Sequence, residues 1–323
     1  AGVATDLIPD IDAEYRQIRE ECGLLVRERA GIAVAGPDAG DYLQGQITND
    51  ADGLATGSGC YALLLDRKGH IQADMRLLRP ETESFRIDTE PSAGPGLLKH
   101  LRTYMIGRKV EVEEAPVTVL SLLGPGSVEV SGLAPGDEFA STPATIAGVD
   151  CLAVATDSGL DLLCAPQHAD TLRHQLVADG AVPISEGAAE ILRVEAGRPA
   201  LGKEMATAPM PAEAGVVERA VDFTKGCYVG QEPVARLHYR GRPNRHLRGL
   251  MLDGAVADGD PVRLGERSLG SIGTNVISPA SGRIALAILR REAEPGTVVS
   301  VETADGEAAG TVVELPFPAA EES

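Results

Sequence analysis

The segment Lys225-Gly-Cys-Tyr-Val-Gly-Gln-Glu232 places an ammonium, a thiol and a carboxylate within eight residues. A nearby cation lowers the pKa of a thiol and so favours the reactive thiolate. Lys225 lies two residues before Cys227, which makes Cys227 a candidate nucleophile. The alternative is that Cys227 is a small buried residue, as most free cysteines are.

The same segment opens a basic stretch. Between residues 225 and 248, six lysines and arginines face one acid, Glu232, which gives a local charge of +5 in a chain whose net charge is −19. A cluster of positive charge in an otherwise acidic protein raises the local concentration of anions. Arg236 and Arg240 are therefore candidate contacts for an anionic ligand, and the alternative is a solvated linker.

The composition argues against several classes of protein. With 48 acidic against 29 basic residues, we expect no binding to nucleic acid over the whole surface, because that needs a basic face. No apolar run reaches the roughly 20 residues that span a bilayer, and the first residues lack the pattern of a secretory signal. These features predict no membrane partner and a cytoplasmic location. The five cysteines have no paired spacing, which favours reduced thiols and predicts no metal site.

The hydrophobic pattern indicates which elements position these residues. Apolar residues at helical spacing predict helices, and short apolar runs between turn residues predict strands. We expect helices at 10–22, 97–105, 167–177 and 186–195, and a β-hairpin over 61–78 that turns at Asp66-Arg-Lys-Gly69. From residue 247 onward, six short strands separated by Gly, Pro, Asp and Ser predict a small antiparallel barrel.

The octet at 225–232 resembles the signature of the YgfZ folate-binding proteins, relatives of the glycine cleavage T-protein, which is an aminomethyltransferase. The resemblance covers roughly residues 11–315 and includes the segments 36–50, 66–74 and 192–204. It implies an α+β fold, a three-part cloverleaf of antiparallel-sheet domains around a central opening, with a small C-terminal β-barrel. The implied parts are a first α+β part at 1–115, a second at 116–184, a central helix and signature segment at 185–243 that returns to the first part, and the barrel at 244–318.

The resemblance also implies that the ligand is tetrahydrofolate or another reduced folate. The pterin presents a ring N–H beside an exocyclic amine, and one carboxylate can accept both hydrogen bonds. The position that matches the family's Arg-x-Glu-Ala-Gly motif is Glu195, and Arg236 and Arg240 are expected to meet the anionic glutamate tail. The folate-binding positions implied by the octet itself are Lys225, Tyr228, Gln231 and Glu232.

The candidate catalytic residues are Cys227 and Asp74. A carboxylate within hydrogen-bond reach of a folate nitrogen could act as general acid or base. T-proteins carry two adjacent acids at this hairpin, whereas this chain reads Ala73-Asp74. Asp74 is therefore either the family's catalytic acid or its neighbour.

Two functions follow from the resemblance. The first is a tetrahydrofolate-binding accessory protein that acts in the assembly, repair or maintenance of iron–sulfur proteins, which are then its partners. The second is a folate-dependent one-carbon transferase that moves an aminomethyl or methylene unit, as the T-protein does. The octet, which T-proteins lack, favours the first, and the sequence leaves open whether a substrate is turned over. A third reading is a pocket reused for another planar anion, such as a porphyrin.

Overall fold

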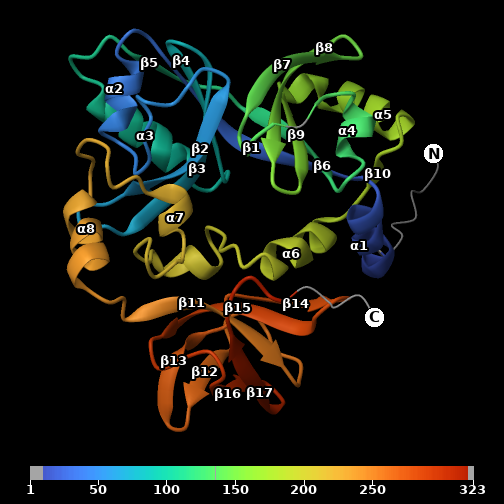
Figure 1. Ribbon diagram of the computed structural model, residues 1–323, viewed down its shortest axis with the longest axis vertical. Coiled ribbons are helices and arrows are strands. Elements are labelled where there is room, and N and C mark those ends of the chain that lie inside the picture. The colour runs from blue at the N-terminus through green and yellow to red at the C-terminus, as the bar shows by residue number, and fades with distance from the viewer. Residues whose placement is uncertain (1–9, 135, 319–323) are drawn as a thin grey trace. The chain divides into compact units, whose positions relative to one another are not determined.

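The computed structural model describes residues 10–134 and 136–318, which divide into two compact units (Figure 1). Unit 1 combines residues 10–28 with 117–190, and unit 2 combines residues 29–116 with 191–318. Strand β1 (Gly23–Ala35) and helix α6 (Glu186–Glu195) each begin in one unit and end in the other. Each unit has a hydrophobic core of its own.

Unit 1 is built on an antiparallel sheet in the order β6-β9-β8-β7. Leu172 and Leu176, four residues apart on α5, are fully buried in the core beside the sheet residues Leu120 and Leu162. The two residues of β10 pair in parallel with the first residues of β1. The elements of this unit are α1 (Ile11–Glu20), β6 (Val117–Leu123), α4 (Ser127–Ser131), β7 (Ser141–Ile146), β8 (Val149–Thr156), β9 (Gly159–Cys164), η1 (Pro166–His168), α5 (Ala169–Ala178) and β10 (Val182–Pro183).

Unit 2 begins with a second antiparallel sheet, in which β2, β3, β4 and the end of β1 follow one another and β5 also pairs with β1. Its elements are α2 (Ala39–Gln44), β2 (Ser58–Leu65), β3 (Ile71–Glu81), β4 (Ser84–Thr89), α3 (Gly94–Tyr104) and β5 (Glu111–Glu114). One face of the sheet is apolar and packs with Tyr42 and Leu43 of α2 and Leu97 and Leu101 of α3. Because side chains alternate along a strand, the opposite face carries the residues in between.

The chain then crosses unit 2 through short helices before it enters the barrel. These elements are the end of α6, η2 (Glu204–Thr207), α7 (Val217–Ala220) and α8 (Gln231–Arg240). The helix α8 was not predicted, because its arginines and Pro233 are typical of an exposed linker rather than of an amphipathic helix with a wide apolar stripe. Only Val234 of α8 is fully buried.

The C-terminal part is an antiparallel sheet in the order β13-β12-β16-β17-β11-β15-β14, drawn in orange and red in Figure 1. Its strands are β11 (Arg245–Leu252), β12 (Pro261–Leu264), β13 (Arg267–Ser271), β14 (Thr274–Ser278), β15 (Gly282–Arg290), β16 (Val298–Thr303) and β17 (Gly306–Val313). The predicted α+β class, with antiparallel sheets and a C-terminal barrel, is confirmed. One strand was missed, because the sequence Arg-Ser-Leu-Gly-Ser of β13 has a single large apolar residue. Across residues 10–134 and 136–318, none of the helices is both long and apolar enough to cross a membrane.

Candidate functional site

The polar face of the unit 2 sheet positions Asp74. Leu63 of β2 lies opposite Asp74 of β3, so Tyr61, two residues before Leu63, shares a face with Asp74. The Tyr61 hydroxyl donates a hydrogen bond of 2.9 Å to Asp74 Oδ2. Asp74 Oδ1 is buried and has no hydrogen-bond partner in the described part of the chain. Burial raises the pKa of Asp74 above its ordinary value, although the Tyr61 hydrogen bond opposes the shift.

A second carboxylate on the sheet, Asp88, has a lowered pKa where that of Asp74 is raised. Asp88 of β4 is buried and accepts hydrogen bonds from Arg76 Nε at 2.8 Å and from Arg29 Nε at 3.2 Å. Burial alone would raise the pKa of Asp88, but Arg76 and Arg29 outweigh it and hold the pKa below its ordinary value. The pKa of Asp74 is raised and that of Asp88 is lowered. With such a pair of carboxyl groups, one can act as an acid while the other stays ionised.

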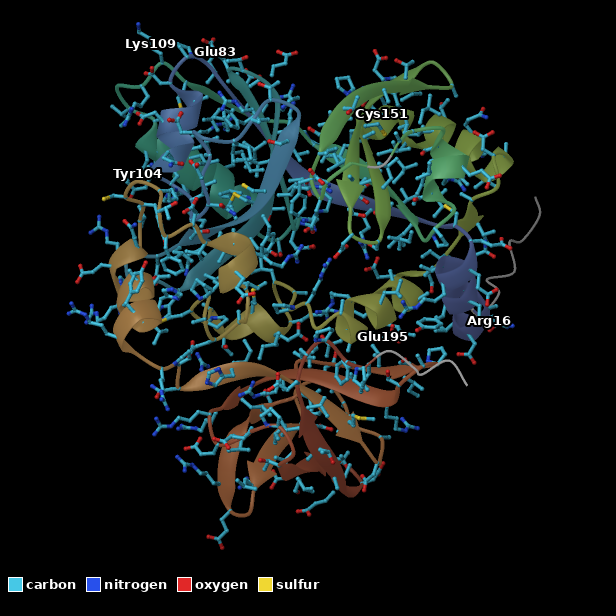
Figure 2. All side chains as sticks on the ribbon, viewed as in Figure 1. Arg16, Glu83, Tyr104, Lys109, Cys151 and Glu195 are labelled. Carbon is cyan, nitrogen blue, oxygen red and sulfur yellow. The ribbon has the colours of Figure 1, made fainter. Side chains whose placement is uncertain are left out.

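Glu195 is the last residue of α6 and is fixed against the barrel, as Figure 2 shows. It is 8% exposed, and its Oε1 accepts a hydrogen bond of 2.5 Å from the Ser278 hydroxyl of β14. Two residues earlier, Arg193 donates to Glu204 at 3.0 Å and to Thr274 of β14 at 2.8 Å. The end of α6 is therefore held on β14 through two neighbouring side chains.

Lys225 contacts the end of α2. Its Nζ donates to the backbone oxygens of Gln44 at 2.6 Å and Ile47 at 2.7 Å. The ammonium also lies 4.9 Å from the centre of the Tyr228 ring. Burial lowers the pKa of Lys225 from 10.5 to about 8. A cation that satisfies carbonyls at a helix C-terminus is stabilised there by the helix dipole, so this side chain ties the octet to α2.

The rest of the octet packs on the β2–β3 hairpin. Gly230 has φ +82°, and a Cβ there would lie 2.5 Å from the Asp66 backbone oxygen. Tyr228 is buried, and its hydroxyl has no partner within residues 10–134 and 136–318. Gly226 has open space around it, and Cys227 is exposed. Lys225, Tyr228 and Gly230 thus fix the octet to the fold, whereas Gly226 and Cys227 between them face solvent.

The remaining predicted residues lie on α8. Gln231 is its first residue, and Glu232 forms an exposed ion pair of 3.6 Å with Arg236. Arg240, the last residue of the helix, is exposed. Figure 1 shows α8 at the edge of unit 2, away from the end of α6 that carries Glu195. The predicted residues therefore fall into four places: the Asp74–Tyr61 pair, Glu195 on β14, the octet on the hairpin and α2, and α8.

Comparison with known proteins gives the family. The profile of the GCVT N-terminal domain matches residues 4–225, and that of the glycine cleavage T-protein C-terminal barrel domain matches residues 245–318. The chain belongs to the glycine cleavage T-protein family. The aminomethyltransferase of Streptomyces coelicolor is 30% identical over 341 residues, which cover 95% of this chain and 91% of that protein. The aminomethyltransferase of Thermus thermophilus is 30% identical over 310 residues, covering 87% and 85%.

The fold of this T-protein family member is shared with a solved structure. The crystal structure of glycine cleavage system aminomethyltransferase T from Bartonella henselae superimposes with a TM-score of 0.86 at 21% identity, covering 96% of this chain and 90% of that one. This likeness shows the shared fold, and the two domain profiles confirm the predicted relationship to the T-protein.

Sequence reasoning missed Tyr61, which donates to Asp74, and the neighbouring Asp88 with its two arginines. Arg76 and Arg29 donate to Asp88, and none of these four residues was assigned a role. A signal was present, because charged residues that interrupt apolar strands are unusual unless they are paired. Arg76 lies between Met75 and Leu77, and both of these are fully buried.

Proposed function

We propose that this member of the T-protein family binds tetrahydrofolate or a related reduced folate on unit 2. One observation carries the proposal: the buried Oδ1 of Asp74 has no hydrogen-bond partner among the described residues, whereas Oδ2 accepts from Tyr61. A buried carboxyl oxygen left unpaired costs roughly 1–3 kcal/mol. Folds keep such a cost mainly where a ligand or a reaction uses the group. The N–H groups of a reduced folate are donors of the required kind.

Glu195 has the chemistry to hold the pterin. A carboxylate can accept two parallel hydrogen bonds from neighbouring donors, and Glu195 accepts one bond from the Ser278 hydroxyl. Its attachment to β14, directly and through Arg193, fixes the direction of the carboxylate. We assign the paired donors of the pterin to Glu195 and the reacting part of the folate to Asp74.

A bound folate supplies nitrogens that carry a one-carbon unit, and the protein supplies the proton handling. Because its pKa is raised by burial, the Asp74 carboxyl keeps its proton to a higher pH than an exposed one. Tyr61 orients the carboxyl through Oδ2. Asp88 stays ionised beside Arg76 and Arg29 and neutralises part of their charge near the site.

We further propose that the folate-bound protein serves the assembly, repair or maintenance of iron–sulfur proteins. Two features support this reading over simple aminomethyl transfer. The hairpin carries one acid, Asp74, after Ala73, where T-proteins have two. Cys227 is exposed, and the neighbouring Gly226 has open space around it. A client protein could therefore approach the thiol.

The second candidate is one-carbon transfer to the folate. It is favoured by the raised pKa of Asp74, which suits general acid–base work, and by relatives named aminomethyltransferase that cover most of this chain. The two candidates share the folate site and differ in whether turnover accompanies binding.

Thermal unfolding with added ligand tests the shared claim. A ligand at 100 times its Kd stabilises the folded state by about 2.7 kcal/mol, so tetrahydrofolate should raise the melting temperature while a porphyrin does not. The absence of any shift with reduced folates would contradict the proposal. If reduced folates do bind, two assays distinguish the candidates. Formation of methylene-tetrahydrofolate from an aminomethylated carrier protein would favour the transferase. Loss of iron–sulfur enzyme activity in cells that carry Cys227→Ser, with no such turnover, would favour the accessory role.

A further inference from the structure

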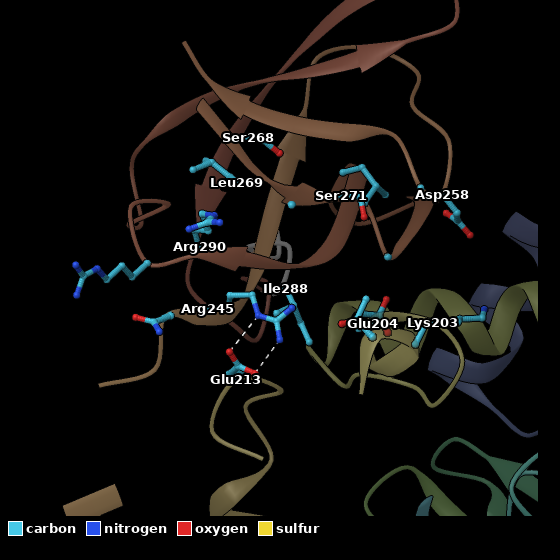
Figure 3. Close-up of a pocket in the computed structure, with 18 of the residues that line it drawn as sticks. Lys203, Glu204, Glu213, Arg245, Asp258, Ser268, Leu269, Ser271, Ile288 and Arg290 are labelled. Atoms are coloured by element: carbon cyan, nitrogen blue, oxygen red, sulfur yellow. Dashed lines mark hydrogen bonds and ion pairs between the residues drawn. The ribbon is translucent and has the colours of Figure 1, made fainter. Parts of the chain in front are cut away.

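A cavity of about 1070 Å³ lies within unit 2, between the barrel strands β13 and β15 and the segment around η2 (Figure 3). This is the volume of a site for a small organic molecule. Its lining residues include neither Asp74 nor Glu195, nor any residue of the octet. The cavity is therefore separate from the folate site proposed above.

Two acids of the cavity lining, Glu213 and Glu292, are paired with arginines. Glu213 accepts two hydrogen bonds of 3.0 Å from Arg245, drawn as dashed lines in Figure 3. Glu292, which also lines the cavity, lies 2.6 Å from Arg267. These pairs leave neither carboxylate available to neutralise a further cation.

The two other acids of the lining also have partners. Glu204 accepts from Arg193 at 3.0 Å and from the Ala200 backbone N–H at 2.9 Å. Asp258 accepts from the backbone and the side chain of Asn275 at 2.9 and 2.7 Å. Each of these acids therefore has a partner through at least one oxygen, but Glu204 Oε1 is buried and has no hydrogen-bond partner among the described residues.

Arg290 is an exposed arginine of the lining, and it has no acidic partner among the described residues. It lies directly opposite Arg245 across the β11–β15 pair, an arrangement in which like charges repel. Glu213 neutralises Arg245, whereas the Arg290 guanidinium has no hydrogen bond or ion pair to any described residue. Figure 3 shows Arg290 between Leu269 and the Arg245–Glu213 pair, on the wall of the cavity.

We propose that this cavity binds a small organic anion whose phosphate or carboxylate group lies against Arg290. The planar guanidinium can donate two parallel hydrogen bonds to either group. Ser268 and Ser271 line the same cavity, and their hydroxyls can donate to further anionic oxygens. Arg291, also on the lining, adds a second positive charge.

Calorimetric titration with inorganic pyrophosphate and with γ-linked triglutamate tests the proposal and distinguishes the two anionic groups. At least one probe should bind saturably to the full chain. Arg290→Ala removes a charge-assisted pair and should weaken that binding about tenfold to a hundredfold. Arg283→Ala is the matched control, because Arg283 is an exposed arginine of the same strand outside the cavity, and its variant should bind within about twofold of the wild type.

Two results would overturn the proposal. One is that neither probe binds below about 10 mM, which is weaker than specific anion recognition. The other is an equal loss in Arg290→Ala and Arg283→Ala, which would mean that only the general charge of the surface attracts the anion. Thermal melting of both variants confirms that they fold, and tetrahydrofolate affinity should be unchanged in both because the folate site is separate.

Discussion

Replacing Lys225 by Met tests whether the octet is tied to α2 by this side chain. The substitution removes two charge-assisted hydrogen bonds, to the backbone oxygens of Gln44 and Ile47. Each such bond contributes about 1.5–3 kcal/mol. The lowered pKa of Lys225 shows that burying the ammonium costs more than its charged interactions return. The loss in the variant therefore comes from the two buried backbone oxygens that are left without a donor, about 1–3 kcal/mol for such a group. We therefore expect the free energy of unfolding to fall by about 1–3 kcal/mol at neutral pH.

Urea denaturation of Lys225→Met and of Lys99→Met measures this loss. Lys99 is exposed on α3, so its variant should stay within about 0.5 kcal/mol of the wild type. The difference should also depend on pH. Because the folded pKa of about 8 lies below the ordinary 10.5, the unfolded state binds more protons between these values. The contribution of Lys225 to stability should therefore increase as the pH rises from about 8 to 10.5.

A wild-type stability in Lys225→Met, together with a tenfold weaker folate affinity, would refute this reasoning. The ammonium would then belong to the ligand and not to the end of α2. The sequence predicted that Lys225 binds folate, and this experiment decides between the two roles.

Three further predictions concern the hairpin, the thiol and the buried acid. Gly230→Ala should lower the free energy of unfolding, measured by urea denaturation, by at least about 2 kcal/mol, because φ is positive and the added Cβ meets backbone. Gly226→Ala should cost less than about 0.5 kcal/mol, and equal losses in the two variants would contradict this account of the octet. Cys227 should be alkylated first among the five cysteines near pH 7, as followed by mass spectrometry, because the other four are buried or half-buried. Faster labelling of any of those four would contradict the exposure argument. Asp74→Asn should raise the melting temperature at neutral pH. A carboxyl whose folded pKa is raised contributes its full stabilisation below its ordinary pKa of 3.8 and loses it as the pH rises from there through the folded pKa. The gain in Asp74→Asn should therefore disappear near pH 3.8, and a gain that does not change with pH would exclude the titration of Asp74 as its cause.

Local pattern predicted the elements of this fold well where a single strand or helix carries its own periodicity. The hairpin that holds Asp74 was expected from two strand segments on either side of the turn at Asp66–Gly69, and the barrel was expected from the regular spacing of short strands. The strand β13 was missed because it has one large apolar residue, and α8 was missed because it buries only Val234. The strand β13 is held by pairing with the adjacent strand β12, and α8 is held through the contacts of Val234 with distant residues such as Leu63 and Leu65.

The candidate site could be predicted in its residue types but not in its contacts. Lys225 and Cys227 are two residues apart, which suggested that the cation serves the thiol. In the fold, the ammonium bonds to carbonyls about 180 positions earlier in the chain, at Gln44 and Ile47. Similarly, Tyr61 and Asp74 meet through strand register, which sequence spacing alone does not reveal. Tertiary neighbours, rather than neighbours in sequence, decide what each charged group does.

Calorimetric titration of tetrahydrofolate into the wild-type protein and into Glu195→Gln tests the central claim most directly. The substitution keeps the shape of the side chain and replaces a carboxylate by an amide with one acceptor oxygen. If Glu195 holds the pterin, affinity should fall about tenfold to a hundredfold, the equivalent of about 1.5–3 kcal/mol. Glu307→Gln, at an exposed position of β17, should leave the affinity unchanged. Equal affinity in the wild type and Glu195→Gln would contradict the assignment of Glu195, and no binding by the wild-type protein would contradict the folate proposal itself.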